Sequence, residues 1–452
     1  MTDQKNGKLR VFLLILAALV IAAAWVALRT PASPFDGAAA PPPPSAELIR
    51  RGEYVARQAD CVACHSTPKS KPFAGGLEMA TPLGAIYATN ITPDRGSGIG
   101  DYSLAEFDRA LRHGVARDGH RLYPAMPYPS YAKMSDEDVS ALYAYFMHGV
   151  KPVVQANQES DIPWPLNMRW PLAFWNLAFT SPHPYQPDPK QDALWNRGAY
   201  LVQGAGHCGS CHTPRGVAMN EKGLDGGHPL YLSGALLDGW YAPSLRGDVN
   251  TGIGRWSEAE VVQFLKTGRN QHAVVFGSMA DAFNNSTQFL SDPDLQAIAR
   301  YLKSLPGDPK RDGDPWKYDN ATTTALAAQR LDSPAARTYM AKCAACHAVD
   351  GRGRAPWIPP LAGAVSSLAK EDASAINVTL NGSVRVVADG VPDSYRMPPF
   401  RSQLSDAEIA DVLSFIRSSW GNHGGAVKVD DVKTLRDRTN PASSNPIVLQ
   451  MR

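Results

Sequence analysis

The sequence has few cysteines for its length, and none of them is spare. Its 452 residues include six cysteines, all within three copies of C-x-x-C-H: "DCVACHSTP" (60–68), "GHCGSCHTP" (206–214) and "KCAACHAVD" (342–350). Disulfide frameworks are typical of short secreted chains, whereas a chain of this length can bury a core without crosslinks. A zinc site requires further ligands at fixed spacing, and a thioredoxin-like pair requires no adjacent histidine. C-x-x-C-H is the attachment pattern of c-type haem.

Each copy supplies the groups that a covalent haem requires. Two thiols about one helical turn apart add to the two vinyl groups of the haem, and the histidine meets the iron from one face. We therefore predict three covalently bound haem c groups, one for each copy. The predicted attachment and proximal residues are Cys61, Cys64, His65, Cys208, Cys211, His212, Cys343, Cys346 and His347.

The sequence also lacks a large excess of positive or negative charge, and it lacks the common catalytic motifs. The net charge is +2 and charged residues make up 19% of the chain, which does not suggest the clustered basic surface of a nucleic-acid-binding protein. We find no G-x-G-x-x-G after a strand, no P-loop and no Ser-His-Asp signature. We therefore predict no catalytic residues in this chain.

The main apolar run lies at the N-terminus. Residues 11–28 carry no charge and follow Lys5, Lys8 and Arg10. The run is short for a spanning helix and long for a signal peptide, and no good cleavage pattern follows it. We favour an uncleaved anchor, with a cleaved signal as the alternative. Either way the basic end stays in the cytoplasm, which predicts a protein of the inner membrane with its body on the periplasmic side.

Strand patterns are scarce, whereas helical segments recur three times. Residues 98–114 resemble residues 252–268 and, more weakly, 371–382, and each reads as an amphipathic helix closed by a glycine. Later segments begin with the predicted N-caps Ser135, Ser291 and Ser405. A helical run with a tyrosine precedes each motif, and the three tyrosines are Tyr54, Tyr200 and Tyr339.

These repeats predict an all-α fold. It has three tandem cytochrome c-type domains, each wrapped around one covalent haem, behind a single N-terminal membrane segment. The predicted divisions are an anchor or signal (1–30), a Pro/Ala-rich spacer (31–45), unit one (46–155), a Trp/Pro-rich connector (156–190), unit two (191–306), a linker (307–324), unit three (325–421) and a polar tail (422–452).

The sixth ligand of each iron is predicted to be a methionine. An iron that only carries electrons has both axial positions filled, and histidine with methionine raises its potential. Each unit has one methionine in the loop between its middle and last helices. A lone methionine is usually core filler, but three in matching places favour ligation. These predicted ligands are Met126, Met279 and Met397. The remaining histidines have no repeat-matched placement, and we assign none of them to iron.

Four longer motifs resemble a known family. They are "LYPAMPYPSYAKMSDEDVSALYAYFMHGVKPV" (122–153), "DIPWPLNMRWPLAFW" (161–175), "YLSGALLDGWYAPSLRGD" (231–248) and "FLKTGRN" (264–270). With the three C-x-x-C-H motifs they resemble the tri-haem cytochrome c subunit of membrane-bound bacterial dehydrogenases that act on alcohol, gluconate, sorbitol or fructose. The likeness runs from about residue 47 to residue 421. The sequence departs from the family at its N-terminus, where an apparent anchor replaces a processed signal.

The resemblance implies an electron-transfer subunit. Its partner would be a catalytic dehydrogenase subunit that carries PQQ, FAD or a molybdenum cofactor, and it would pass electrons to ubiquinone or to a downstream cytochrome or oxidase. The alternative is a multihaem enzyme with an open iron, such as a peroxidase or nitrite reductase, and three candidate methionines argue against it. A terminal oxidase would need several membrane spans.

The connector allows two interpretations. Trp164, Arg169, Trp170 and Trp175 lie in a stretch with few other charges. Buried aromatic residues usually provide packing, which suggests a strap between units one and two. Tryptophan beside arginine also suits the headgroup level of a bilayer, which suggests contact with the membrane or with quinone.

Overall fold

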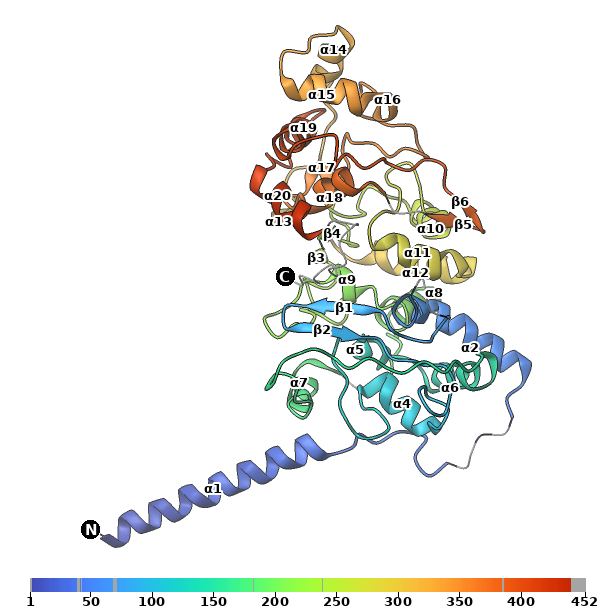
Figure 1. The fold of residues 1–452 in the computed structure, drawn as a ribbon, viewed down its shortest axis with the longest axis vertical. Helices are drawn as coiled ribbons and strands as arrows, with labels where there is room; N and C mark the ends of the chain where they lie inside the picture. The colour runs from blue at the N-terminus through green and yellow to red at the C-terminus, as the bar shows by residue number, and fades with distance from the viewer. Residues whose placement is uncertain are drawn as a thin grey trace.

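The three repeated segments lie in chain order along the long axis of the molecule (Figure 1). The structure is a computed structural model, and it describes residues 2–38, 41, 43–67, 71–181, 183–237, 239–383 and 386–439. The part of the predicted tail from residue 440 onward, and residues 39, 40 and 42 of the predicted spacer, lie outside the described residues. Each unit has a hydrophobic cluster of its own.

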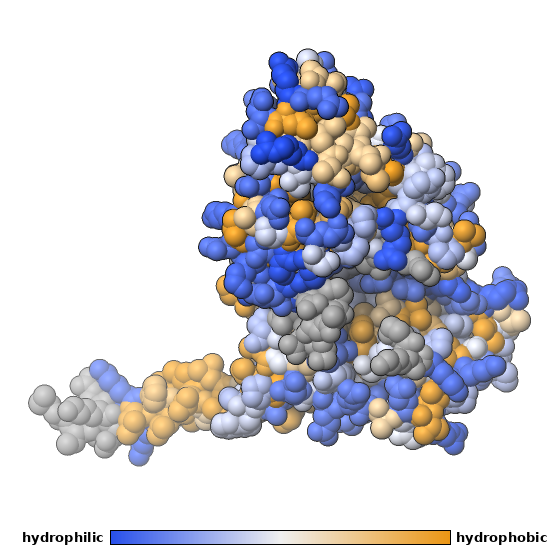
Figure 2. Space-filling model, turned by 45° about the horizontal axis from the view of Figure 1, so that its top comes forward, coloured by the Kyte–Doolittle hydropathy of each residue, from blue (hydrophilic) through white to orange (hydrophobic). Residues whose placement is uncertain are grey.

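The N-terminal segment forms helix α1 (Thr2–Leu28), which projects away from unit one (Figure 1). Within it, Lys8–Leu28 has a mean hydropathy of 3.0, and none of its most apolar stretch is buried against the rest of the chain. Figure 2 shows this helix as an apolar rod beside a body whose visible face is mostly hydrophilic. Length and composition therefore suit a membrane span, although a signal sequence would share both properties.

All three units share one order of helices: a first helix, a single turn at the C-x-x-C-H motif, a middle helix and a last helix. Unit one contains α2 (Ala46–Gln58), α3 (Cys61–Cys64), β1 (Glu78–Thr81), β2 (Gly84–Tyr87), α4 (Leu104–His113), α5 (Tyr128–Tyr131), α6 (Asp136–Ala144) and a π-helical turn (Tyr145–Gly149). Unit two contains α8 (Ala193–Gln203), α9 (Gly209–His212), β3 (Ala235–Leu237), β4 (Trp240–Ala242), α10 (Glu258–Thr267), α11 (Met279–Asn285), a 3-10 turn (Thr287–Phe289) and α12 (Asp292–Ser304).

Unit three follows the same plan with a displaced hairpin. Its elements are α14 (Ala321–Ala327), α15 (Pro334–Lys342), α16 (Ala344–His347), α17 (Val365–Leu368), α18 (Ala373–Asn381), β5 (Val387–Ala388), β6 (Val391–Pro392) and α19 (Asp406–Ser418). The hairpin lies between the motif and the middle helix in units one and two, but it follows the middle helix α18 in unit three. The connector contributes α7 (Leu172–Phe179) and the linker contributes α13 (Pro309–Asp312).

The prediction of an all-α fold is correct for the framework but misses the hairpins. The described part of the chain has three pairs of strands, and each is antiparallel, as in the register of Glu78 opposite Tyr87 and of Ala235 opposite Ala242. The strands are two to four residues long. Strands this short show too little alternation of polar and apolar residues to stand out in the sequence.

Local signals in the sequence define the ends of the repeated helices. The side chains of Ser135, Ser291 and Ser405 each accept a hydrogen bond from a backbone N–H in the first turn, as predicted. Gly114 and Gly268 close the middle helices of units one and two in the left-handed conformation, with φ of 61° and 74°. A glycine adopts this conformation without the steric cost that a Cβ adds.

The first and last helices of each unit pack against each other: α2 with α6, α8 with α12, and α15 with α19. In units one and two the contact is close because a glycine lies at the crossing. A Cβ on Gly52 would lie 1.9 Å from the carbonyl oxygen of Ala141, and one on Gly198 would lie 1.9 Å from that of Ala297. This packing fixes the helix that leads into each motif.

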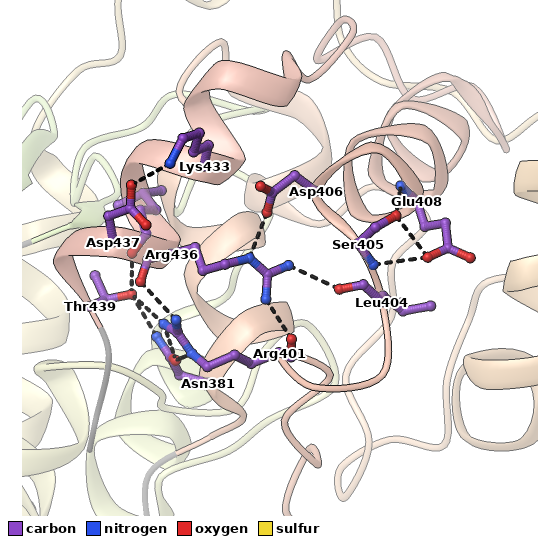
Figure 3. Close-up of polar contacts among 11 residues, drawn as sticks. Asn381, Arg401, Leu404, Ser405, Asp406, Glu408, Lys433, Arg436, Asp437 and Thr439 are labelled. Atoms are coloured by element: carbon purple, nitrogen blue, oxygen red, sulfur yellow. Dashed lines mark hydrogen bonds and ion pairs between the residues drawn. The ribbon is translucent and has the colours of Figure 1, made fainter. Parts of the chain in front are cut away.

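Part of the predicted polar tail is a packed helix. Helix α20 (Val429–Arg438) contacts α18 and α19, and Val432 on it is fully buried. Figure 3 shows how Arg436 joins it to unit three: the guanidinium donates to Asp406 at 2.6 Å and to the carbonyl of Leu404 at 2.9 Å. The sequence suggested a tail because most side chains of this segment are polar, and a single buried valine gives little signal.

Candidate haem-binding sites

Each C-x-x-C-H motif forms one turn of helix directly after the first helix of its unit. The backbone N–H of the histidine closes this turn on the carbonyl of the first cysteine, at 3.0 Å for His65, 3.0 Å for His212 and 2.9 Å for His347. Residues three and four apart on a helix share a face. The turn therefore brings two thiols and one imidazole to one side, as attachment of a haem requires.

The three imidazoles are held in the same way. Nδ1 of His65 lies 2.7 Å from the carbonyl oxygen of Thr89, that of His212 lies 2.7 Å from Pro243, and that of His347 lies 3.1 Å from Pro359. A carbonyl only accepts, so Nδ1 carries the hydrogen and Nε2 keeps its lone pair. Burial lowers the pKa of all three rings, which favours the neutral form. A neutral, oriented imidazole with a free Nε2 is a metal ligand.

The first thiol of each motif lacks the environment of a redox-active cysteine. Burial raises the pKa of Cys61 to about 12, that of Cys208 to about 12 and that of Cys343 to about 11. Thiols that exchange disulfides have a lowered pKa, because the thiolate is the nucleophile. These environments argue against the thioredoxin-like alternative.

A single cavity of about 850 Å³ joins the sites of units two and three. Both cysteines and the histidine of the second and third motifs line it, together with Met279 and Met397. Its walls are largely apolar and include Trp240, Phe264 and Phe400. An apolar cavity with a few convergent polar groups fits a large planar cofactor. The structure thus brings the predicted residues of two haem sites into one space, which the sequence did not indicate.

Two of the three candidate methionines, Met279 and Met397, line the same cavity as the second and third motifs. Met126 packs against the hydrophobic cluster of unit one, and Met397 packs against that of unit three and lines the shared cavity. Met279 begins α11 and lines the shared cavity. By contrast, Met134 is fully buried in the cluster of unit one. The residues present therefore fit a haem c with a sulfur ligand in units two and three, and Met126 stays the predicted ligand of unit one.

The first motif borders unit two. Helix α3 contacts α11, and Asp60, directly before Cys61, lines the same cavity as the second motif. Burial and the charge of Asp281 raise the pKa of Asp60 to about 8. The ring of His207 packs edge-on against Tyr131 of unit one, with centroids 5.6 Å apart. The first and second sites are therefore neighbours, as are the second and third.

The known proteins that this chain resembles are cytochromes c. The cytochrome c family model matches residues 49–149 and 333–420, which lie in units one and three. The chain is 51% identical, over 89% of its length and 87% of the relative's, to the cytochrome c subunit of a quinone-dependent alcohol dehydrogenase from Gluconacetobacter polyoxogenes. It is 52% identical to the gluconate 2-dehydrogenase cytochrome c subunit of Pantoea cypripedii (86% and 89%). It is 38% identical to the fructose dehydrogenase cytochrome subunit of Gluconobacter japonicus (88% and 84%).

The chain belongs to this family of dehydrogenase cytochrome c subunits. The resemblance seen in the sequence is thereby confirmed. Within this cytochrome c subunit, the second unit lies outside the family-model match, but it shows the same motif turn and imidazole hydrogen bond as the other two.

Sequence reasoning missed several residues that shape these sites. The carbonyls that orient the imidazoles come from Thr89, Pro243 and Pro359, and a backbone carbonyl leaves no mark on a sequence. The sequence predicts only a linker at residues 307–324, yet Trp316 in it lines the shared cavity, and its Nε1 donates to the carbonyl of Trp420 at 3.1 Å. A lone tryptophan in a polar segment was the signal that could have revealed this.

Proposed function

We propose that this chain is a three-haem electron-transfer subunit of a dehydrogenase complex, with the unit and linker boundaries predicted from the sequence. Cys61, Cys64, Cys208, Cys211, Cys343 and Cys346 would hold the haems. Three histidines (His65, His212, His347) and three methionines (Met126, Met279, Met397) would be the axial ligands. The observation that carries the proposal is the hydrogen bond from each motif histidine to a backbone carbonyl, repeated in all three units.

The haem iron supplies reversible one-electron chemistry when it is bound. The protein's part is to fix the ligands and to exclude water. The carbonyls of Thr89, Pro243 and Pro359 hold each imidazole with Nε2 free, so each ring would need no reorientation to hold a haem iron. A thioether sulfur carries no charge and an apolar wall disfavours the extra charge of oxidised iron, so both raise the potential.

The order of the sites suggests a path for electrons. The first motif borders unit two, and the second and third motifs share one cavity. Electrons could therefore move between adjacent sites along the whole body without leaving the protein.

The partners follow from the relatives. Their names specify alcohol, gluconate and fructose as substrates of the complexes, and one names quinone. We propose that a separate catalytic subunit, dependent on PQQ, FAD or molybdenum, oxidises the substrate. This chain would then pass the electrons to ubiquinone or to a downstream cytochrome or oxidase. An enzyme with an open iron, such as a peroxidase, is less well supported, because each unit has a methionine at the matching place in its repeat.

We place the protein at the inner membrane with its body in the periplasm. Helix α1 has the length, hydropathy and exposure of a spanning helix, and Lys5, Lys8 and Arg10 precede its apolar stretch. Basic residues remain on the cytoplasmic side of a first spanning segment. The exported side is where haem c is attached in bacteria, so the two assignments agree.

Haem content and Met279→Ala test the proposal together. Pyridine haemochrome analysis of the purified complex should give three haems per chain, and two or fewer in mature protein would contradict it. In Met279→Ala one iron should lose its sulfur ligand, bind carbon monoxide when reduced and lose its share of the long-wavelength Met–iron absorption. Met219→Ala is the matched control, since Met219 lies in unit two but is not a proposed ligand. Unchanged spectra in Met279→Ala would exclude this residue as the ligand.

A further inference from the structure

The connector between units one and two exposes a row of large apolar side chains. Trp164 is 78% exposed, Trp170 is 53% exposed and Leu177 is 64% exposed. Leu166 and Met168 between them are exposed as well. Soluble surfaces seldom expose contiguous apolar side chains of this size, so such a patch indicates a partner or a membrane.

The opposite face of the connector is firmly attached to the body. Nε1 of Trp175 donates to the carbonyl of Ala218 in unit two at 2.7 Å. The amide of Asn176 donates to the carbonyl of His113 at 3.2 Å and accepts from the hydroxyl of Tyr128 at 2.7 Å. The strap interpretation therefore holds for this inner face, and it leaves the outer face presented at a fixed position.

The connector also lies against α1. Helix α7 contacts α1, beside the end of α1 that joins the body (Figure 1). Trp25, near this end of α1, is 61% exposed. Tryptophans from two separate segments thus gather where the helix would leave the bilayer, which is the level that tryptophan prefers.

Arginines join the same two segments. The guanidinium of Arg121 donates to the carbonyl of Arg29, which directly follows α1, at 3.0 Å. Arg169 of the connector donates to the carbonyl of Arg121 at 3.1 Å and lies over the ring of Tyr123, 3.6 Å from its centroid. Residues 162–187 contain no aspartate or glutamate. The positive charge of the partly exposed Arg169 therefore complements lipid phosphates, whereas Arg121 is buried and only joins the two segments.

We infer that the outer face of the connector (Trp164, Leu166, Met168, Trp170 and Leu177) rests in the headgroup layer of the bilayer that α1 spans. Unit one then contacts the membrane through both α1 and the connector. A body held by α1 alone could rotate about that helix, and the second contact fixes its orientation. This inference rests on the proposed function only in taking α1 as a membrane anchor. A bilayer fits this face better than a protein does, because the face adjoins the end of α1 and pairs tryptophan with arginine.

Photocrosslinking of the full chain in its native membranes tests the inference. We would place the photoreactive residue p-benzoylphenylalanine singly at Trp164, Trp170, Leu19 and Val391. Leu19 lies in the middle of α1 and reports on the anchor separately, whereas Val391 is an exposed valine of unit three, 68% exposed. All four side chains are exposed, so the substitutions should not disturb folding, and haem content would verify this.

The expected result is a lipid adduct at positions 164, 170 and 19 and none above background at 391. An adduct at 164 or 170 with the catalytic subunit would overturn the inference and identify the face as a protein interface. A lipid adduct at 19 alone would overturn it while leaving the anchor intact. The absence of lipid adducts at all positions would contradict both the inference and the assignment of α1. Equal adducts at 391 would also overturn it, because the face would then be no different from the rest of the surface.

Discussion

Tyr54 of unit one and Tyr200 of unit two make the same contact in opposite directions. The hydroxyl of Tyr54 donates to Asp294 at 2.7 Å in the last helix of unit two. The hydroxyl of Tyr200 donates to Asp138 at 2.5 Å in the last helix of unit one. The hydroxyl of Tyr54 also accepts a hydrogen bond from the backbone N–H of the N-cap Ser291 of unit two. The hydroxyl of Tyr200 likewise accepts one from the N-cap Ser135 of unit one. Units one and two therefore pair reciprocally, as two copies of a domain do about a two-fold axis.

Removal of these hydroxyls should weaken this pairing. Tyr54→Phe and Tyr200→Phe each delete a hydrogen bond to a carboxylate, at a cost of about 1.5–3 kcal/mol. Thermal or urea unfolding, followed by haem absorption, would measure the loss. Tyr339→Phe is the control, because its hydroxyl donates within unit three to the carbonyl of Ala348. If Tyr339→Phe were the only destabilising change, the reciprocal contacts would contribute little.

Lys133 should make stability depend on pH. Burial lowers its pKa to about 8, although its ammonium donates to Gln203 at 2.8 Å and to the carbonyl of Leu224 at 2.6 Å. Because the unfolded chain keeps this proton up to about pH 10.5, the free energy of unfolding should rise between about pH 8 and 10.5. The full rise corresponds to roughly 3 kcal/mol.

Other groups titrate in the same range, so the comparison with Lys133→Met isolates this one. The difference in thermal midpoint between the native protein and the variant should change steadily from pH 7 to pH 10. A difference that is constant with pH would show that folding does not lower the pKa of Lys133.

Gly52→Ala and Gly198→Ala should force two helix pairs apart. The added Cβ would lie 1.9 Å from a carbonyl oxygen of the facing helix in both cases, so the helices must move. Overpacking of this kind costs about 1–3 kcal/mol or more, and we expect lower thermal midpoints. Gly96→Ala is the control, because the nearest atom to its added Cβ is a side-chain oxygen at 3.6 Å. Equal midpoints for all three variants would mean that the crossings are not tight.

Arg436→Met should detach α20 from unit three. The change removes the bonds to Asp406 and to the carbonyls of Leu404 and Arg401, at a cost of about 2 kcal/mol (Figure 3). Limited proteolysis should then cut between α19 and α20 faster. Lys433→Met breaks an exposed pair with Asp437 on the same helix and should change nothing measurable. Resistance to protease equal to that of the native protein would contradict a structural role for Arg436.

The sequence alone determined the features that depend on residues close together in the chain. The motif turns and the serine caps involve groups within a few positions of one another, so the residue types alone predict them. The repeats showed that three similar units follow one another, and the long apolar run near the N-terminus predicted the helix α1. Ligation by Met126, Met279 and Met397 stays a prediction, because sequence and structure place the sulfurs without showing the bond.

Only the tertiary structure decided how the units meet. Tyr54, Tyr200 and Tyr339 precede their motifs in similar runs, yet the first two cross to a neighbouring unit and the third bonds within its own. The shared cavity of units two and three joins side chains from positions 58 to 417. Such contacts depend on which surfaces exclude water together when the whole chain packs, and no single segment encodes that choice.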